Sequence, residues 1–156
     1  MSQPCHLEMD APCHILVEGN PAIVYASRGG GPSRVLPLLE RFLEKFWQER
    51  DISGQDADTP ECLVAQIVVR FGFEICEDDF SNLRVGIRYD PRADYLYLVS
   101  ADRQISVWVP EIEYRGNPAS GLGGCRHWTP PAELAKELES FHTAAIAGKS
   151  LKAKDE

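Results

Sequence analysis

The sequence predicts an α+β fold in which helices pack on one face of an antiparallel sheet of about five strands. Three observations predict this fold class: β-branched and aromatic runs near the N-terminus, apolar side chains at a helical period over residues 35–47, and alternating apolar and polar side chains over residues 83–89. The expected order is β-β-α-α-β-β-β-α, in a single domain over residues 11–147 with flexible tails at 1–10 and 148–156.

A β-hairpin is the first expected element. Residues 14–18 and 23–26 are rich in β-branched and aromatic side chains, and Gly19, Asn20 and Pro21 lie between the two runs. Proline fixes its own φ angle and therefore suits a turn. We expect two adjacent strands joined at this point.

A long amphipathic helix is expected after the glycine run at residues 29–31. Its apolar face holds Val35, Leu39, Leu43 and Phe46, and charged side chains cover the opposite face. Pro37 is compatible with this helix only in the first turn, where its missing N–H has no partner to lose.

Residues 60–76 fit either a strand or a helix, because their apolar side chains match both periods. Thr59 followed by Pro60 and Glu61 is typical of a helix N-terminus, and a strand of this length would be unusual in so small a domain. This favours a helix from about residue 60 to residue 71.

A three-strand antiparallel meander is expected over residues 83–109. In its first strand, alternation predicts that Val85 and Ile87 are buried and that Arg84 and Arg88 are exposed. Residues 95–99 are apolar on both faces, as in a central strand, and residues 105–109 complete the meander.

The end of the chain predicts a glycine-rich loop over residues 115–128 and then a last helix. Thr129, Pro130 and Pro131 would begin this helix. Its apolar face would hold Leu134, Leu138, Phe141 and Ala145. The resulting element order resembles that of small sensory and scaffold domains of the PAS or profilin-like kind. No residue motif accompanies this resemblance, so it implies no site residue.

Composition excludes several classes of function. The chain carries 16 Lys and Arg against 24 Asp and Glu, a net charge of −8, which disfavours general binding to nucleic acid or to anionic lipid. The sequence has neither a signal-peptide pattern nor an apolar run of about 20 residues that would span a bilayer. Five cysteines at irregular spacing argue against a secreted disulfide framework. We therefore expect a cytoplasmic protein with free thiols.

Metal and cofactor binding are not expected. Cys5, His6, Cys13, His14 and the pair Cys125 and His127 carry possible ligands, but no Cys-x₂-Cys spacing is present. The simpler interpretation places Cys13 in the core and His14 on the surface.

An anion-binding loop is a candidate at the start of the long helix. The segment combines flexible glycine amides, a helix N-terminus and two arginines, in the set Arg28, Gly29, Gly30, Gly31 and Arg34. It lacks the Gly-Lys-Ser/Thr ending of a nucleotide-binding loop. A plain strand-to-helix connection is the alternative, and it is the interpretation that we favour.

No coherent catalytic set is present, so we do not expect an enzyme. A Gly-x-Ser-x-Gly motif is absent. Cys125 with His127 is the candidate nucleophile–base pair, because two-residue spacing can place both on one side of an extended chain.

The expected function is that of a regulatory or adaptor domain acting through protein–protein contacts, with another protein or a second copy of this chain as partner. Trp, Tyr and Arg are enriched at binding hot spots. The candidate interaction surface holds Trp108, Tyr114, Arg115, Trp128, Arg84 and Arg88. The alternative is a small-molecule or anion sensor, with a pocket between sheet and helices or at the glycine loop.

Overall fold

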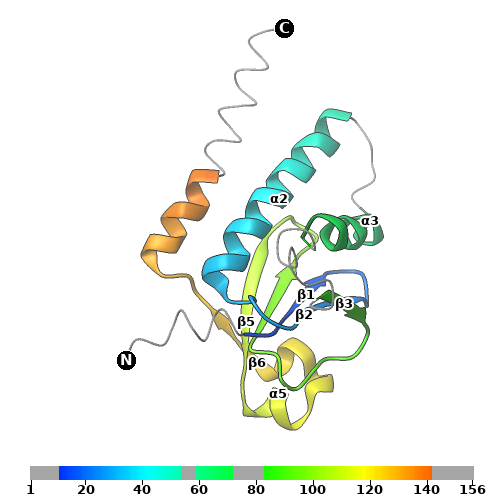
Figure 1. Ribbon diagram of the computed structural model, residues 1–156, viewed down its shortest axis with the longest axis vertical. Coiled ribbons are helices and arrows are strands. Elements are labelled where there is room, and N and C mark those ends of the chain that lie inside the picture. Colours follow the sequence, from blue (N-terminus) through cyan, green and yellow to red (C-terminus); the bar gives the residue numbers. More distant parts are fainter. Residues whose placement is uncertain (1–10, 54–58, 72–82, 142–156) are drawn as a thin grey trace, which may run out of the picture.

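A computed structural model describes residues 11–53, 59–71 and 83–141 of the chain. Its fold is α+β, as predicted, and its six strands form one mixed sheet in the order β3-β2-β1-β4-β5-β6 (Figure 1). The strands are β1 (Cys13–Val17), β2 (Ile23–Ala26), β3 (Leu83–Gly86), β4 (Tyr95–Val99), β5 (Ile105–Pro110) and β6 (Cys125–Trp128).

The N-terminal hairpin is confirmed. β1 and β2 are antiparallel, with Cys13 opposite Ala26. Between them, Gly19 has a φ of 92°, which favours glycine, and the side chain of Asn20 accepts a 2.9 Å hydrogen bond from the backbone N–H of Ala22.

The predicted meander is wrong in its first strand. β3 pairs with β2, while β4 pairs in parallel with β1 and antiparallel with β5. β1 is buried on both faces and pairs along both of its edges, so it lies between β2 and β4 in the sheet. The sheet is therefore mixed, and residues 87–94 carry the chain from β3 back to the start of β4.

The burial expected for Val85 and Ile87 is also wrong: their side chains are 53% and 74% exposed. β3 lies at the edge of the sheet, and the main core that the helices cover includes Val24 of β2 but not Val85, its partner on β3. Arg84 and Arg88 are exposed, as predicted.

A sixth strand was not expected. β6 lies in the segment predicted to be a loop, and it pairs antiparallel with β5, with Trp128 opposite Val107. It follows a short helix, α5 (Ile112–Gly116), and a 3₁₀ segment, η2 (Pro118–Gly124). The four residues of β6 lack a clear alternating pattern, and the glycines before them favour a loop.

The long helix is confirmed as α2 (Pro32–Ser53), with Val35, Leu39 and Leu43 fully buried. It begins earlier than the sequence predicts, since the Gly31 carbonyl accepts a 2.9 Å hydrogen bond from the N–H of Val35. Pro37 therefore lies beyond the first turn, where proline removes a helical hydrogen bond.

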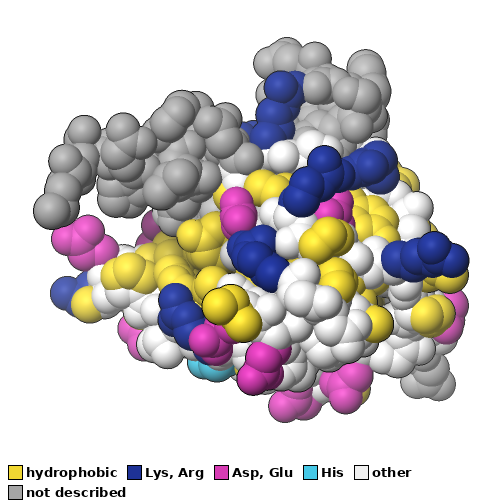
Figure 2. All heavy atoms as spheres, turned by 90° about the horizontal axis from the view of Figure 1, so that it is seen from below, with side chains coloured by type: hydrophobic (Ala, Val, Ile, Leu, Met, Phe, Trp, Pro, Cys, Tyr) yellow, Lys and Arg dark blue, Asp and Glu magenta, His cyan; other side chains and the backbone are white. Residues whose placement is uncertain are grey.

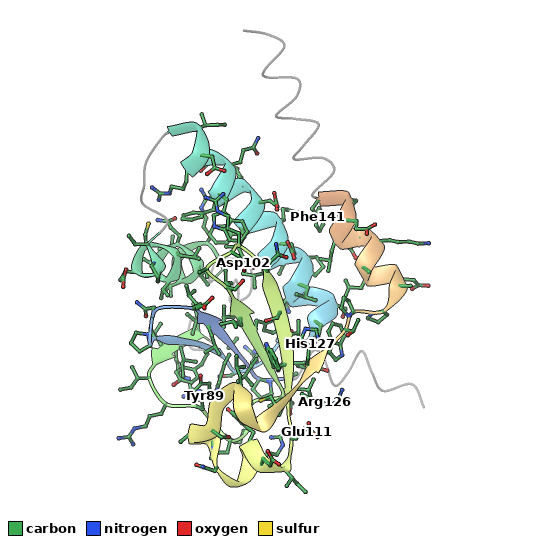
Figure 3. The ribbon with its side chains drawn as sticks, turned by 180° about the vertical axis from the view of Figure 1, so that it is seen from behind. Tyr89, Asp102, Glu111, Arg126, His127 and Phe141 are labelled. Atoms are coloured by element: carbon green, nitrogen blue, oxygen red, sulfur yellow. The ribbon has the colours of Figure 1, made fainter. Side chains whose placement is uncertain are left out.

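The ambiguous segment is helical. α3 (Pro60–Gln66) begins at Thr59, whose hydroxyl accepts the N–H of Cys62 at 3.3 Å, and continues into a π-helical turn, η1 (Ile67–Phe71). A last helix over residues 132–141 lies beside α2 (Figures 1 and 3), where the guanidinium of Arg41 is 5.0 Å from the ring centroid of Phe141. Ala145 lies outside the described residues.

The two faces of the sheet are covered differently. The main core lies between one face and the helices α2, α3 and 132–141. A smaller core on the opposite face holds Leu16, Leu96 and Tyr114, with Tyr114 supplied by α5. The expectation of helices on one face alone therefore holds for the long helices only. None of the helices in the described part of the chain has the length and apolarity needed to cross a bilayer.

Candidate binding site at the β3 edge of the sheet

The β3 edge combines exposed apolar and basic side chains. In β3 and the two residues after it, Val85 and Ile87 alternate in the sequence with Arg84, Gly86 and Arg88. Because side chains of a strand point to alternate faces, Val85 lies on one face of β3 and Arg84 on the other; Ile87 and Arg88 follow the end of the strand. We call these residues, 84–88, the β3 edge.

Tyr25 of β2 orders the arginine side of this edge. Its hydroxyl donates to the Arg88 carbonyl and accepts the Arg88 N–H at 3.1 Å. The Arg84 guanidinium lies 5.7 Å from the Tyr25 ring centroid, a cation–π contact. A Cβ at Gly86 would lie 2.7 Å from the Tyr25 ring, so glycine lets this ring cross β3.

A cavity of about 260 Å³ lies beside the arginine side of the edge, at the start of β1 and the end of β2. Two guanidinium groups and one carboxylate line it. Its lining residues are Pro12, Cys13, His14, Tyr25, Ala26, Ser27, Arg84, Asp90 and Arg92. We call it the His14 cavity.

His14 is buried, contrary to the surface position expected from the sequence. Its side chain is 2% exposed, because residues 87–94 cross the sheet over it, and its ring meets the Tyr25 ring edge-on at 4.7 Å. Burial lowers the pKa of His14 below its ordinary value of 6.5, against the opposing effects of the Cys13 carbonyl and Asp90. Imidazole is therefore neutral at pH 7.

The tautomer of His14 follows from its hydrogen bond. Nε2 accepts the backbone N–H of Asp90 at 2.9 Å, so the single ring proton of neutral imidazole lies on Nδ1. Within the part of the chain that the structure describes, Nδ1 is the buried side-chain nitrogen or oxygen without a hydrogen-bond partner.

Asp90 also lines the His14 cavity and forms several of its hydrogen bonds. Its carboxylate accepts hydrogen bonds from the backbone N–H, Nε and Nη2 of Arg92 at 2.9, 3.2 and 3.2 Å. The bonds from Arg92 lower the pKa of Asp90, so the carboxylate stays ionised. Its main-chain carbonyl accepts the Tyr114 hydroxyl at 2.6 Å.

Two of the residues predicted for an interaction surface hold the loop 87–94 in place. Tyr114 is fully buried, and burial strongly raises its pKa. Arg115 is exposed, yet it donates to the Pro91 carbonyl at 2.8 Å and to the Asp94 carboxylate at 3.3 Å. Tyr114 therefore presents no surface to a partner.

The other residues predicted for the interaction surface lie toward opposite edges of the sheet and form no common surface. Trp108 and Trp128 are half-buried on opposite faces of the sheet, at the β6 end. Trp108 donates to the Ser106 hydroxyl at 2.9 Å and contacts the His127 ring at 5.3 Å. Arg84 and Arg88 lie at the other edge of the sheet.

The glycine loop at residues 29–31 packs against the start of β1 and against Tyr97 of β4. The Gly30 N–H donates to the Ala11 carbonyl at 2.9 Å, and the Gly30 carbonyl accepts the buried Tyr97 hydroxyl at 2.6 Å. Gly29 has a φ of 70°, and Arg34 lies against it. Arg28 and Arg34 are exposed, but Gly29, Gly30 and Gly31 are buried. This geometry favours the plain connection over an anion-binding loop.

Cys125 and His127 lie on one face of β6, as their spacing suggested, without a hydrogen bond between them. Burial and Glu111 raise the pKa of Cys125 to about 11, so the thiol is protonated at pH 7. Figure 3 places Glu111 and Arg126 at the same end of β5 and β6. Over residues 11–53, 59–71 and 83–141, no group of three or more His, Cys, Asp or Glu could hold a metal ion. Cys5 and His6 lie outside the described residues.

From the sequence, His14 was named only as a possible metal ligand, and Tyr25 was given no role. The arginines of this region, Arg84 and Arg92 among them, were expected to pair with nearby aspartates on an open sheet face; Arg92 pairs with Asp90, whereas Arg84 has no carboxylate partner among the described residues. One signal for His14 was available, since it is the polar member of a run of apolar residues, 13–17, buried on both faces. The hydrogen bonds between Arg92 and Asp90 are local, but the contact of the Asp90 N–H with His14 depends on the path of the loop over the sheet, which no local pattern encodes.

Searches for related proteins found no matching family model, no matching curated protein and no matching solved structure.

Proposed function

We propose that this chain is a non-enzymatic adaptor domain that binds an extended segment of another protein along the β3 edge. The observation that carries the proposal is the exposure of Val85 in the outer strand and of Ile87 just after it, beside the exposed arginines Arg84 and Arg88. Large apolar side chains at the edge of a sheet are an uncommon feature unless another chain covers them.

The chemistry of the edge defines the partner segment. An added strand would take main-chain hydrogen bonds from β3, and its side chains would alternate between the two faces. On one face they would meet Val85 and Ile87, and on the other Arg84 and Arg88. The matching segment therefore alternates apolar and acidic residues.

Charge favours another protein over a second copy of this chain. Two copies pairing antiparallel about Gly86 would place Arg84 of one directly opposite Arg88 of the other, and like charges in that position are destabilising. The net charge of −8 does not prevent an acidic segment from binding, because basic and acidic side chains are mixed on the surface, as the face drawn in Figure 2 shows. Exposed charges more than about 8 Å apart are largely screened at physiological salt, so the local arginines dominate.

The test is a titration of ¹⁵N-labelled protein with an octapeptide alternating valine and glutamate, followed by NMR. We expect saturable shifts confined to the amides of residues 83–88, and no such shifts with the matching valine–lysine peptide. Ile87→Asp should abolish them. Ile112→Asp is the matched control, because Ile112 is 88% exposed on α5, away from β3.

Three outcomes would contradict the proposal: no shifts at millimolar peptide, equal shifts with the lysine peptide, or equal binding by Ile87→Asp. Light scattering of the free protein completes the design. A dimer that Ile87→Asp dissociates and Ile112→Asp leaves intact would make the second copy the partner and overturn the assignment to another protein.

A further inference from the structure

We infer that the His14 cavity is a separate binding site for a small oxyanion, a carboxylate or phosphate group carried by a small molecule. The cavity lies beside the β3 edge, shares Arg84 with it, and otherwise uses different side chains. The inference does not depend on the adaptor function, since an anion can bind here whether or not a strand pairs with β3.

His14 has a buried donor without a hydrogen-bond partner. Its Nε2 is occupied by the Asp90 N–H, so Nδ1 carries the proton. The Cys13 carbonyl is close enough to raise the pKa of His14, but no group among the described residues forms a hydrogen bond with Nδ1. Native proteins satisfy nearly all of their buried polar groups, and an exception at a cavity indicates a missing partner. A bound group that completes this site would supply an acceptor, such as an oxygen atom.

The walls of the His14 cavity carry a net positive charge. Arg92 is engaged with the Asp90 carboxylate at 3.2 Å, which leaves the Arg84 guanidinium without a carboxylate partner among the described residues. Arg84 is close enough to His14 to lower the pKa of that residue. Two guanidinium groups, one carboxylate and a neutral imidazole leave the cavity with a net positive charge.

The size and geometry of the His14 cavity also suit a small oxyanion. A volume of about 260 Å³ is at the lower limit of ligand pockets, which suits a small molecule. The planar guanidinium of Arg84 can donate two parallel hydrogen bonds to a carboxylate or a phosphate, and the Tyr25 ring beneath it restricts its position. A cationic ligand would be repelled by the positive charge of the cavity. A purely apolar ligand would leave the Nδ1–H of His14 and the guanidinium of Arg84 without acceptors.

The test is isothermal titration calorimetry of the full chain at pH 7.5 and constant ionic strength. Sodium phosphate and sodium succinate are the two ligand arms, and sodium chloride is the control. We expect saturable binding of one anion at millimolar concentration or tighter, and the arm that binds more tightly identifies the group. Chloride should give no saturable heat.

Three variants locate the site. Arg84→Gln removes the guanidinium that has no carboxylate partner among the described residues. It should weaken anion binding about tenfold or more, the usual effect of losing a charged hydrogen bond. His14→Gln keeps an acceptor near the position of Nε2, lacks the Nδ1 proton, and should also weaken binding. Arg126→Gln, an exposed arginine on β6 at the opposite edge, should leave the Kd unchanged.

Binding of neither anion at 20 mM, or equal Kd values for Arg84→Gln and the unaltered protein, would overturn the inference. Ile87→Asp separates this site from the adaptor surface, since it should abolish peptide binding and leave the anion Kd unchanged. The imidazole ¹⁵N signals provide a second measurement, because an acceptor at Nδ1 shifts the resonance of that nitrogen on anion addition. An unchanged signal at saturating anion would also contradict the site.

Discussion

The backbone N–H of Asp90 donates a 2.9 Å hydrogen bond to Nε2 of His14, which lies 76 positions earlier in the sequence. This bond helps to explain the path of the chain from β3 to β4, which are not neighbours in the sheet. β3 ends opposite the start of β2, and β4 begins opposite Cys13 at the other end of β1. Residues 87–94 must return over one face of the sheet, and His14 of β1 holds them there.

The first prediction concerns this hydrogen bond. His14→Phe removes the acceptor and leaves the Asp90 N–H unpaired, which should lower the free energy of unfolding by about 1–3 kcal/mol. His14→Gln should cost less, because its carbonyl oxygen can take the place of Nε2. Urea denaturation at pH 7.5 measures both values. Equal losses for the two variants would show that the bond contributes little.

The second prediction is the pH dependence of stability. The pKa of His14 is lowered by burial in the folded state, so the unfolded chain binds the proton more tightly. The stability from neutral His14 is therefore fully present above about pH 6.5 and is lost as the pH falls below that value toward the folded pKa. The lowered pKa of Asp90 acts in a different window, below its ordinary value of 3.8.

Thermal unfolding between pH 8 and pH 5 tests this dependence. The unaltered protein should lose stability on acidification, and His14→Gln should show a flatter profile. Parallel profiles for the two proteins would place the responsible proton elsewhere.

The third prediction concerns the glycine loop. A Cβ at Gly30 would lie 2.6 Å from the Cβ of Cys13 and 2.7 Å from the Ala11 carbonyl, so Gly30→Ala forces the loop away from β1. We expect a loss of about 1–3 kcal/mol in unfolding free energy, as for other overpacked sites. Gly123→Ala is the control, because a Cβ there meets nothing within 4 Å. Two mild and similar losses would contradict the close packing.

Long periodic segments were predicted well. The helical period over residues 35–47 describes α2, whose Leu39 and Leu43 are fully buried, and a cap at Thr59 identified α3. Alternation also assigned β3 correctly as a strand. It could not tell which neighbour β3 pairs with, because an edge strand and a central strand can share one alternating pattern.

The candidate site was predicted less well, for a related reason. Arg84 and Arg88 are exposed, as predicted, but the same alternation wrongly predicted burial of Val85 and Ile87. The burial of Tyr114 and His14 depends on a loop that crosses the sheet from a distant part of the chain. Such contacts have no periodic signature in the sequence.

The fourth prediction follows from the corrected position of β3. Ile87→Asp should leave the domain folded, with a change in unfolding free energy within about 0.5 kcal/mol, as for other exposed positions. Val107→Asp should unfold it, because Val107 is buried in the main core and an unpaired charge there exceeds ordinary stability. Circular dichroism and urea denaturation measure both. Unfolding by Ile87→Asp would contradict the exposed position of Ile87 and would support the burial that alternation predicts.

The last prediction concerns Cys125 and separates a structural thiol from a nucleophile. Burial and the nearby Glu111 carboxylate raise the pKa of Cys125 to about 11, with Arg115 opposing them, so the thiolate is scarce at neutral pH. Iodoacetamide labelling, followed by mass spectrometry at each cysteine, should give a half-point for Cys125 well above pH 9.

Two variants identify the cause. Glu111→Gln removes the repelling charge and should lower the half-point, while His127→Ala should not change it, because no hydrogen bond joins His127 to the thiol. A half-point below pH 8 that His127→Ala abolishes would instead indicate an activated nucleophile–base pair. That result would contradict the non-enzymatic function proposed above, since a reactive thiolate requires a local charge that favours it.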